Sequence, residues 1–389
     1  MTDRQARVLV VDDSEDNRDV LARRVRRMGH SVVEAANGRE ALERLGTDAF
    51  DLVLLDIMMP EMNGFQVLEH VHAEPRWRHI PVVVVSALDD MDSVVKCIDL
   101  GAEDYLFKPF NAVLLNSRVG ACLEKKWLRD QEQAYLAATR EQMQLGRQIQ
   151  ADFMPAELPQ LAGWDIAACF RPAYEVAGDF YDVFRLPGDR LGLLLGDVSG
   201  KGVSAALFMA LTRSLVRAYS DYDTASTLDV LNSVFLTNRF ILRHHQQRTS
   251  MFATLFLGVL DTQTGAMNYI NAGHVPPILS RPGGEHELLQ PSGPLVGITE
   301  DIPFVVQQVF MNPGDAVLVY TDGITEAMDA HQELFGADRL LATLRVDHGI
   351  RSADTLLQHI EAAVRTHIGG DTPSDDVTML ALLRLIPTQ

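Results

Sequence analysis

Hydrophobic and polar positions follow one repeating arrangement over the first third of the chain. Continuous apolar runs, each bounded by turn residues, occur at 7–11, 51–55 and 81–85. Segments between these runs place apolar residues at helical spacing, as at 15–28. Continuous apolar strands separated by helices are typical of a parallel sheet that is covered on both faces. The arrangement predicts an α/β domain that extends to about residue 120.

A different pattern occupies about 112–153. Residues 123–150 contain no proline, one glycine and many strong helix formers. One heptad position is occupied by Leu128, Tyr135, Gln142 and Ile149, and a second by Gln131, Ala138 and Leu145. Five of these seven residues are apolar. A helix of about 30 residues spans roughly 45 Å and cannot bury itself. We therefore expect it to pack on a domain or, as we favour, to pair with a second copy in a homodimer.

Short strands with turn signals dominate the chain from residue 164 onward. The predicted strands lie within 164–170, 190–198, 252–261, 266–273 and 316–323. Helical segments are predicted at 203–219, 225–243 and 352–367. This mixture predicts a single α+β domain of roughly 220 residues.

Composition restricts the class of protein further. No apolar run reaches the roughly 18 residues of a membrane span, and "MTDRQAR" lacks the apolar segment of a signal peptide. The three cysteines are far apart, which favours a reduced, cytoplasmic setting. A net charge of −19 argues against nucleic acid as a partner. The same charge suits carboxylates gathered around divalent metals, although an acidic soluble surface would give the same total.

Polar side chains follow four strands of the first domain. Asp12 and Asp13 end the first strand, Asp56 ends the third, Ser86 follows the fourth, and Lys108 follows the fifth. Because these strand ends meet at one edge of the sheet, three carboxylates there require a hard cation such as Mg²⁺. Any one of these residues alone is more easily explained as a helix cap or a turn. All five in order predict a site that receives a phosphoryl group.

Acids at predicted strand ends, three of them next to glycine, mark the second domain. They are Asp179 in "VAGDFYD", Asp197 in "GDVSGKG", Asp322 in "YTDGITEA", and Asp375 with Asp376 in "SDDVTML". Carboxylates with a main-chain carbonyl suit Mg²⁺ or Mn²⁺ rather than zinc. Two such ions about 4 Å apart activate a water for attack on phosphorus. Ordinary Asp-Gly turns are the alternative, but the order and context of these acids favour a two-metal site in which Asp197 bridges and Val198 lends its carbonyl.

The first 120 residues resemble a response-regulator receiver domain through "VLVVDDSEDNR", "LVLLDIMMPEMNGF", "PVVVVSA" and "GAEDYLFKPF". The resemblance implies a doubly wound, flavodoxin-like sheet of five parallel strands, with Asp56 as the phospho-acceptor. The Mg²⁺ ligands that it implies are Asp12, Asp13, Asp56 and the backbone carbonyl of Met58. Lys108 would contact the acyl phosphate, and Ser86 and Tyr105 would be the switch pair.

The segment 147–385 resembles the SpoIIE-type branch of the metal-dependent protein phosphatases (PPM). The shared motifs are "RQIQADFMPAELP", "VAGDFYD", "GDVSGKGVSAALFMA", "MFATLFLGVLD", "NAGHVPP", "YTDGITEA" and "DDVTML". The resemblance implies a β-sandwich flanked by helices and a phosphoserine or phosphothreonine protein as substrate, often an anti-sigma-factor antagonist. The ligands of the first metal would be Asp197, Asp322 and Asp375, with Asp375 preferred to Asp376. The ligands of the second would be Asp197, the Val198 carbonyl and Asp179.

This chain departs from the SpoIIE-type pattern at two points. Ala177 stands where the family usually has the first of two glycines. No arginine is clearly placed to bind the substrate phosphate; Arg171 is a candidate, and equally a solvated surface residue. His274 could donate a proton but more often such a residue holds a turn. Lys201 could contact the phosphate, with a solvated loop residue as the alternative.

Together these patterns predict a receiver domain at 1–120, a helical linker at 121–153 and a phosphatase domain at 154–389. The predicted protein is a response regulator, phosphorylated by a sensor histidine kinase or phosphotransfer protein, whose output is a serine/threonine phosphatase. We expect Mg²⁺ in the receiver and two Mn²⁺ or Mg²⁺ ions in the phosphatase. The alternative is a non-catalytic adaptor that binds a regulatory protein through a phosphatase-like domain. The retained acids favour the enzyme, and no helix-turn-helix or basic patch suggests a DNA-binding output.

Overall fold

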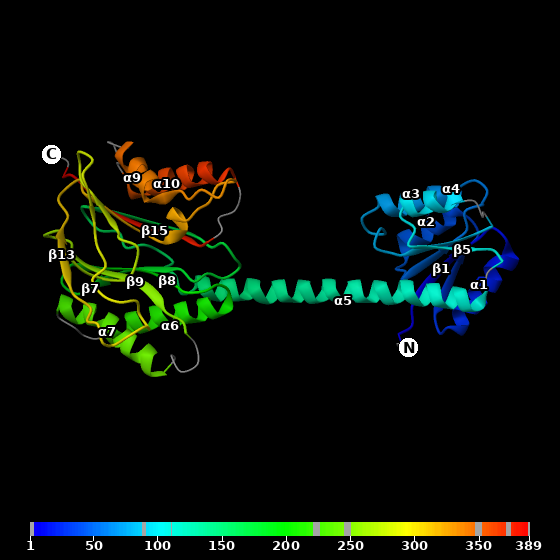
Figure 1. Cartoon of the computed structure of the whole chain (residues 1–389), viewed down its shortest axis with the longest axis horizontal. Coiled ribbons are helices and arrows are strands. Elements are labelled where there is room, and N and C mark those ends of the chain that lie inside the picture. Colours follow the sequence, from blue (N-terminus) through cyan, green and yellow to red (C-terminus); the bar gives the residue numbers. More distant parts are fainter. Residues whose placement is uncertain are drawn as a thin grey trace. The chain divides into compact units, whose positions relative to one another are not determined.

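The computed structural model describes residues 4–87, 91–109, 111–220, 226–244, 250–346, 352–370 and 375–387 (Figure 1). The chain divides into two compact units, Met1–Thr139 and Arg140–Gln389. The division falls inside one long helix, α5 (Ala112–Ala151), so the predicted long helix is confirmed. The domain boundaries at 120 and 153 stay a prediction. None of the helices in the described ranges has the length and hydrophobicity that crossing a membrane requires.

The first unit contains a five-stranded parallel sheet in the order β2-β1-β3-β4-β5. Its strands are β1 (Arg7–Val11), β2 (Ser31–Ala35), β3 (Leu52–Leu55), β4 (Val82–Ser86) and β5 (Asp104–Phe107). The connecting helices are α1 (Glu15–Arg27), α2 (Gly38–Thr47), α3 (Gly64–Ala73) and α4 (Met91–Asp99). The predicted doubly wound α/β fold is confirmed.

Both faces of this sheet are buried, which explains the continuous apolar runs. Val8 and Val10 of β1 pack in a cluster with α1 and the start of α5. Leu9 and Val11 point to the opposite face and pack in a cluster with α2, α3 and α4. Figure 1 shows these helices on the two sides of the sheet. Because successive side chains of a strand alternate between faces, every position of such a strand must be apolar.

The second unit contains two five-stranded antiparallel sheets, ordered β13-β10-β9-β8-β7 and β12-β11-β14-β15-β6. The strands of the first are β7 (Phe180–Leu186), β8 (Arg190–Val198), β9 (Ala253–Asp261), β10 (Ala266–Ala272) and β13 (Gln307–Phe310). Those of the second are β6 (Trp164–Arg171), β11 (Ile278–Ser280), β12 (His286–Leu288), β14 (Ala316–Tyr320) and β15 (Val377–Arg384). Inward-facing residues such as Leu193, Phe256 and Leu380 form the core between the sheets.

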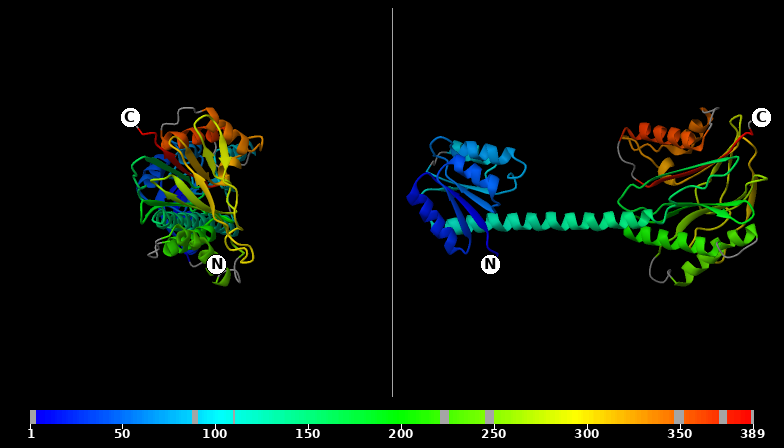
Figure 2. Two further views of the ribbon diagram at one scale, coloured as in Figure 1. Left: turned by 90° about the vertical axis from the view of Figure 1, so that its left-hand side faces the viewer. Right: turned by 180° about the vertical axis from the view of Figure 1, so that it is seen from behind.

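Helices cover the outer face of each sheet, as the two views of Figure 2 also show. α6 (Val203–Ser220) and α7 (Thr227–His244) pack on the sheet that holds β8 and β9. α8 (Asp322–Thr325), α9 (Gly336–Val346) and α10 (Ala353–Ile368) pack on the other sheet. The unit is therefore a β-sandwich flanked by helices, as the resemblance implies. The helix predicted at 225–243 corresponds to α7, and its first position, 225, lies outside the described residues.

Candidate functional site

Three carboxylates lie together at the carboxyl edge of the parallel sheet. Asp12 and Asp13 follow β1, and Asp56 follows β3, so the parallel strands deliver them to one place. One oxygen of each lies within 4.8 Å of the other two. Asp12 and Asp56 are buried and Asp13 is exposed. The sheet thus brings together the three acids that the sequence predicts.

Lys108, directly after β5, bridges the two buried acids. Its Nζ lies 2.6 Å from Asp12 Oδ2 and 2.7 Å from Asp56 Oδ2. Burial by itself lowers the pKa of Lys108, but the hydrogen bonds with both aspartates outweigh burial and the pKa is raised. One ammonium faces three carboxylates, so negative charge remains uncompensated. A divalent cation with oxygen ligands fits this edge.

The surrounding residues hold Asp56 in place. The backbone N–H of Met58 donates to Asp56 Oδ1 at 3.3 Å. A side chain at Gly64 would collide with the Asp56 carbonyl oxygen, so only glycine fits there. Ser86 is fully buried, and its carbonyl accepts the Lys108 N–H at 2.9 Å. The Tyr105 and Phe107 rings lie 4.9 Å apart on the same strand, β5. All five predicted strand-end groups therefore occupy one edge of the sheet.

The acids of the second unit come from four segments. Asp179 directly precedes β7, and Asp197 lies in β8; both strands belong to one sheet. Asp322 begins α8 after β14, and Asp375 and Asp376 precede β15; β14 and β15 belong to the other sheet. Strand ends and the segments next to them thus collect acids where the two sheets meet.

Asp179 is the most deeply buried of these acids, with 2% of its surface exposed. Its Oδ2 accepts hydrogen bonds from Thr321 Oγ1 at 2.8 Å and from Thr378 Oγ1 at 2.6 Å. Burial, followed by the charge of Asp197, raises the pKa of Asp179 well above its ordinary value. The ionised form therefore needs a positive charge beside it.

Asp197 lies amid the other acids. Burial, then the charges of Asp322 and Asp375, raise its pKa to about 7. Burial is also the largest cause that raises the pKa of Asp322. A Cβ at Gly178 would meet the Val198 carbonyl oxygen at 2.9 Å, which places that carbonyl against the loop of Asp179. Carboxylates that repel one another beside a main-chain oxygen are a donor set that fits Mg²⁺ or Mn²⁺.

The neighbouring acids Asp375 and Asp376 make different contacts. Asp376 Oδ1 accepts the Ala173 N–H at 2.8 Å, and its Oδ2 accepts the Gly178 N–H at 2.9 Å. Asp375 Oδ2 instead lies 3.0 Å from Lys201 Nζ. Both oxygens of Asp376 thus bind distant backbone, whereas Asp375 Oδ1 accepts only the N–H of its neighbour Asp376, at 2.9 Å, and this difference favours Asp375 as the metal ligand of the pair.

The two acidic sites differ in how closely their side chains gather. Within the described ranges, one group of three His, Cys, Asp or Glu side chains has its ligand atoms all within 4.8 Å of one another. This group is Asp12, Asp13 and Asp56 of the first unit. The acids of the second unit are neighbours at a wider spacing.

The other residues singled out from the sequence have defined partners. Arg171 Nε lies 2.9 Å from Glu361 Oε1, and Lys201 lies over the Tyr174 ring at 5.4 Å. His274 is 1% exposed, and its Nδ1 lies 2.7 Å from Thr254 Oγ1. Burial lowers the pKa of His274 to about 4. A neutral, enclosed imidazole favours the structural role over proton donation.

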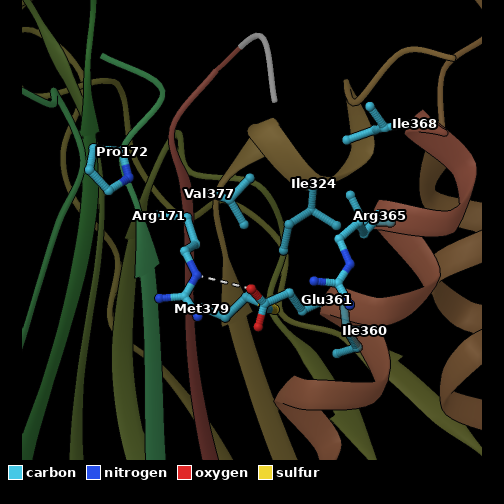
Figure 3. A pocket seen from close by; sticks show the side chains of 10 residues that line it. Arg171, Pro172, Ile324, Ile360, Glu361, Arg365, Ile368, Val377 and Met379 are labelled. Atoms are coloured by element: carbon cyan, nitrogen blue, oxygen red, sulfur yellow. Dashed lines mark hydrogen bonds and ion pairs between the residues drawn. The ribbon is translucent and has the colours of Figure 1, made fainter. Parts of the chain in front are cut away.

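An apolar pocket of about 210 Å³ adjoins the second acidic site (Figure 3). Ile324 on its wall belongs to the same short helix as Asp322, and Val377 directly follows Asp376. Figure 3 shows the Arg171–Glu361 pair among the residues that line it. A mostly apolar cavity therefore lies next to this side of the acidic site.

Sequence reasoning missed three residues that support the acids: Thr321, Thr378 and Gln150. The two threonines stand beside the acids, in "YTDG" and "DDVT", and that proximity is the only signal they carry. Gln150 Nε2 donates to the Ala177 carbonyl at 2.7 Å. Ala177 is buried, so the turn before Asp179 accommodates its methyl group in place of the usual glycine.

Comparison with known proteins separates the two units in the same way. Residues 187–384 match the family model of stage II sporulation protein E (SpoIIE), and residues 8–120 match that of the response regulator receiver domain. Protein IcfG of Synechocystis sp. is 38% identical over 267 residues, which is 63% of this chain and 42% of IcfG. The Caulobacter vibrioides response regulator PleD is 39% identical over 126 residues, which is 32% of this chain and 28% of PleD. The chain thus spans less than half of these relatives.

Two solved structures resemble the chain. The RsbU and RsbW domains of a Mycobacterium tuberculosis protein align with a TM-score of 0.51 and 31% identity, covering 61% of this chain and 64% of that one. The SiaA-PP2C domain of Pseudomonas aeruginosa aligns with a TM-score of 0.56 and 21% identity, covering 65% of this chain and 99% of that domain. The second similarity concerns the fold alone.

Proposed function

The chain belongs to the SpoIIE family and carries a response regulator receiver domain, and from this premise we propose that phosphorylation of Asp56 controls a metal-dependent serine/threonine phosphatase within the same chain. Receiver and PPM-type phosphatase domains in one chain make a response regulator with a phosphatase output. The catalytic activity, its substrate and its control are the parts that we propose.

The observation that carries the proposal is the meeting of acids from four segments at one place, where Asp179 is buried and Asp197, Asp322 and Asp375 are partly exposed. Asp179, Asp197, Asp322 and Asp375 would hold two Mn²⁺ or Mg²⁺ ions together with the Val198 carbonyl. Bound divalent ions supply an activated water and neutralise charge on the phosphoryl group. Raised pKa values at Asp179, Asp197 and Asp322 support this assignment, because bound cations would offset the burial and the mutual repulsion that raise them.

Residues of the chain orient this donor set. Thr321 and Thr378 fix the Asp179 carboxylate by donating to one of its oxygens. Asp376 fixes the loop ahead of Asp179 through the Gly178 N–H. Lys201 adds a positive charge beside Asp375. An anionic phosphoprotein would meet that charge at the more exposed side of the site.

On the input side, Asp56 accepts the phosphoryl group. A carboxylate oxygen of Asp56 forms a bond to phosphorus while the bond between phosphorus and the donor breaks, and the donor leaves with that electron pair. Lys108, 2.7 Å from Asp56 Oδ2, is placed to hold an oxygen of the new acyl phosphate. Asp13, Asp56 and the Met58 carbonyl would hold Mg²⁺, with Asp12 assisting. Ser86 and Tyr105 would then change position.

The proposed partners follow from these two chemistries. A sensor histidine kinase or phosphotransfer protein supplies the phosphoryl group in the cytoplasm. The substrate is a phosphoserine or phosphothreonine protein; the similarity to an RsbU domain supports a phosphorylated anti-sigma-factor antagonist. We also propose a homodimer through α5, where Leu128 and Tyr135 are 61% and 71% exposed. Neither nucleic acid nor membrane is part of the proposal.

A direct assay tests this function. The purified chain is incubated with a phosphoserine protein and Mn²⁺, with and without a small acyl-phosphate donor, and released phosphate is measured. We expect metal-dependent hydrolysis whose rate changes when the donor is present. A chain that binds the phosphoprotein without releasing phosphate, at any Mn²⁺ concentration, would instead be the adaptor, and the catalytic proposal would be wrong.

A further inference from the structure

The last turn of α5 is hydrogen-bonded to the loop that precedes Asp179. Gln150, only 7% exposed, donates from Nε2 to the Ala177 carbonyl oxygen at 2.7 Å. Its Oε1 accepts the Ala177 backbone N–H at 3.0 Å. One side-chain amide therefore satisfies both polar groups of one buried peptide residue. Both partners are buried, so water does not readily replace either bond.

Ala177 is two residues before Asp179, and the residue between them is also held. The Gly178 N–H donates to Asp376 Oδ2 at 2.9 Å. A Cβ at Gly178 would meet the Val198 carbonyl oxygen at 2.9 Å, so the loop lies close against the end of β8. Gln150 on one side and Asp376 on the other thus fix the backbone that carries the Asp179 carboxylate.

Apolar packing next to Gln150 is incomplete. A pocket of about 310 Å³ lies between the end of α5 and α6, and its lining includes Met143, Ile149 and Leu207. Contacts across such a gap locate a helix less strictly than close packing does. The paired hydrogen bonds of Gln150, which have fixed direction and length, therefore define the position of this helix end relative to the loop.

We propose that Gln150 is a positioning residue for Asp179, and that through Ala177 it sets the affinity of the phosphatase unit for its divalent metal ions. The inference deepens the proposed function and rests on the proposed metal site. Without the Gln150 amide, the Ala177 peptide loses both of its partners, the 177–179 segment samples other positions, and the Asp179 carboxylate is less often aligned with the remaining ligands. The effect is on metal binding, so excess metal restores the reaction.

The test replaces Gln150 with methionine, which has nearly the same volume and cannot make either bond. The matched control is Gln148→Met, an exposed position of the same helix turn. Both are built in the full chain carrying Asp13→Asn and Asp56→Asn, so that the receiver edge does not contribute, and Mn²⁺ binding is measured by calorimetry. We expect at least a tenfold weaker Mn²⁺ affinity for Gln150→Met, which corresponds to about 1.4 kcal/mol, and no change for Gln148→Met.

A second readout uses hydrolysis in the otherwise unsubstituted chain. Gln150→Met should need more Mn²⁺ for half-maximal rate yet approach the same rate at saturating Mn²⁺, with KM for the phosphoprotein unchanged. If Gln150→Met does not fold, Gln150→Asn keeps the amide but shortens its reach, and the same shift is expected. Mn²⁺ affinity equal to that of the control in either folded variant would overturn the inference alone. No Mn²⁺ binding by the chain with Gln150 intact would overturn the metal site and the inference together.

Discussion

Thr378 Oγ1 lies 2.6 Å from Asp179 Oδ2, although the two residues are 199 positions apart in the sequence. Thr378 belongs to β15 of one sheet, whereas Asp179 directly precedes β7 of the other. Thr321 donates to the same oxygen at 2.8 Å, and its own Oγ1 accepts the Thr378 N–H at 3.0 Å. Two hydroxyl groups thus tie the loop of one sheet to the strands of the other at the acidic site.

Replacing Thr378 with valine should weaken metal binding by the phosphatase unit. The change keeps the shape of the side chain and removes a buried hydrogen bond to a carboxylate, which contributes about 1.5–3 kcal/mol. We expect the Mn²⁺ concentration for half-maximal activity to rise roughly tenfold or more. Thr366→Val, which removes an exposed helical hydroxyl, is the matched control. Equal metal dependence of the two variants would show that Thr378 does not support Asp179.

Asp197→Asn and Asp322→Asn should each abolish metal-dependent hydrolysis while the chain stays folded. Each change removes a charge that the proposed metal ions need and leaves the side-chain volume nearly constant. Released phosphate is measured at saturating Mn²⁺, and circular dichroism checks the fold. Undiminished hydrolysis by either variant would contradict the two-metal assignment.

The stability of the metal-free chain should depend on the protonation of Asp197. Its pKa is about 7 in the folded chain and about 3.9 in an unfolded one, so the folded state holds the proton more tightly. The contribution of this group to the free energy of unfolding is therefore present at low pH and falls as pH rises from about 4 to about 7.

Calorimetry in a chelating buffer measures this effect. Asp197→Asn should unfold at a higher temperature than the native chain at pH 7.5, and the difference should shrink at pH 5. Added Mn²⁺ should stabilise the native chain at pH 7.5 and do much less for the variant. A difference that is the same at both pH values would show that Asp197 has an ordinary pKa.

Phosphorylation should occur on Asp56, and its effect on the phosphatase rate should depend on Lys108. A small phosphodonor with Mg²⁺ should add one phosphoryl group to the native chain and none to Asp56→Asn, as measured by intact-mass spectrometry. Lys108→Ala should still accept the group, but the change in phosphatase rate should be lost, because the ammonium no longer contacts the acyl phosphate. An acyl phosphate on another residue would contradict the assignment of Asp56.

Exposed apolar residues of α5 should hold two copies together. Leu128→Ser with Tyr135→Ser should shift the chain from dimer to monomer in sedimentation experiments and reduce the change in rate that phosphodonor causes. Gln133→Ser with Arg140→Ser, which share the seven-residue spacing on another face of the helix, are the control. If the first pair leaves both oligomeric state and response unchanged, the helix is a passive tether.

Local patterns in the sequence predict most of the elements that have two buried faces or a marked end, although β15, an apolar and buried strand, is not among the predicted strands. The apolar run before Asp56 and the glycines beside Asp197 are such signals, and both acids lie at strand ends as expected. β11, β12 and β13 have only three or four residues each and depend on pairing with neighbouring strands, so no local pattern marks them. β7 contains a buried aspartate, Asp182, which a distant arginine, Arg213, contacts at 2.7 Å. Because the charged Asp182 interrupts the apolar residues of β7, a search for apolar runs does not detect this strand.

The residues that position the acids cannot be found in this way. Gln150 and Ala177 are 27 positions apart, and only the packing of α5 in the second unit brings them together. The choice between Asp375 and Asp376 is likewise made by distant backbone, since the N–H groups of Ala173 and Gly178 occupy one of the pair. Sequence identifies acids that can ligate a metal, whereas only the tertiary contacts show that Asp376 binds the backbone of two distant residues.

Asp375 is the proposed metal ligand, whereas Asp376 binds two backbone N–H groups. This difference predicts which substitution would convert an enzyme of this architecture into a protein that only binds its partner. Losing the first acid would remove a proposed ligand and free only the neighbouring Asp376 N–H, while the Ala173 and Gly178 N–H groups stay bonded to the second acid, so we expect the surface proposed to meet a phosphoprotein to survive. Losing the second acid frees two backbone donors and loosens the loop of Asp179, which damages shape and chemistry together. A substitution at position 375 is therefore more compatible with a folded, non-catalytic binding protein than a substitution at position 376. A relative that keeps only the second acid would be expected to bind without hydrolysing.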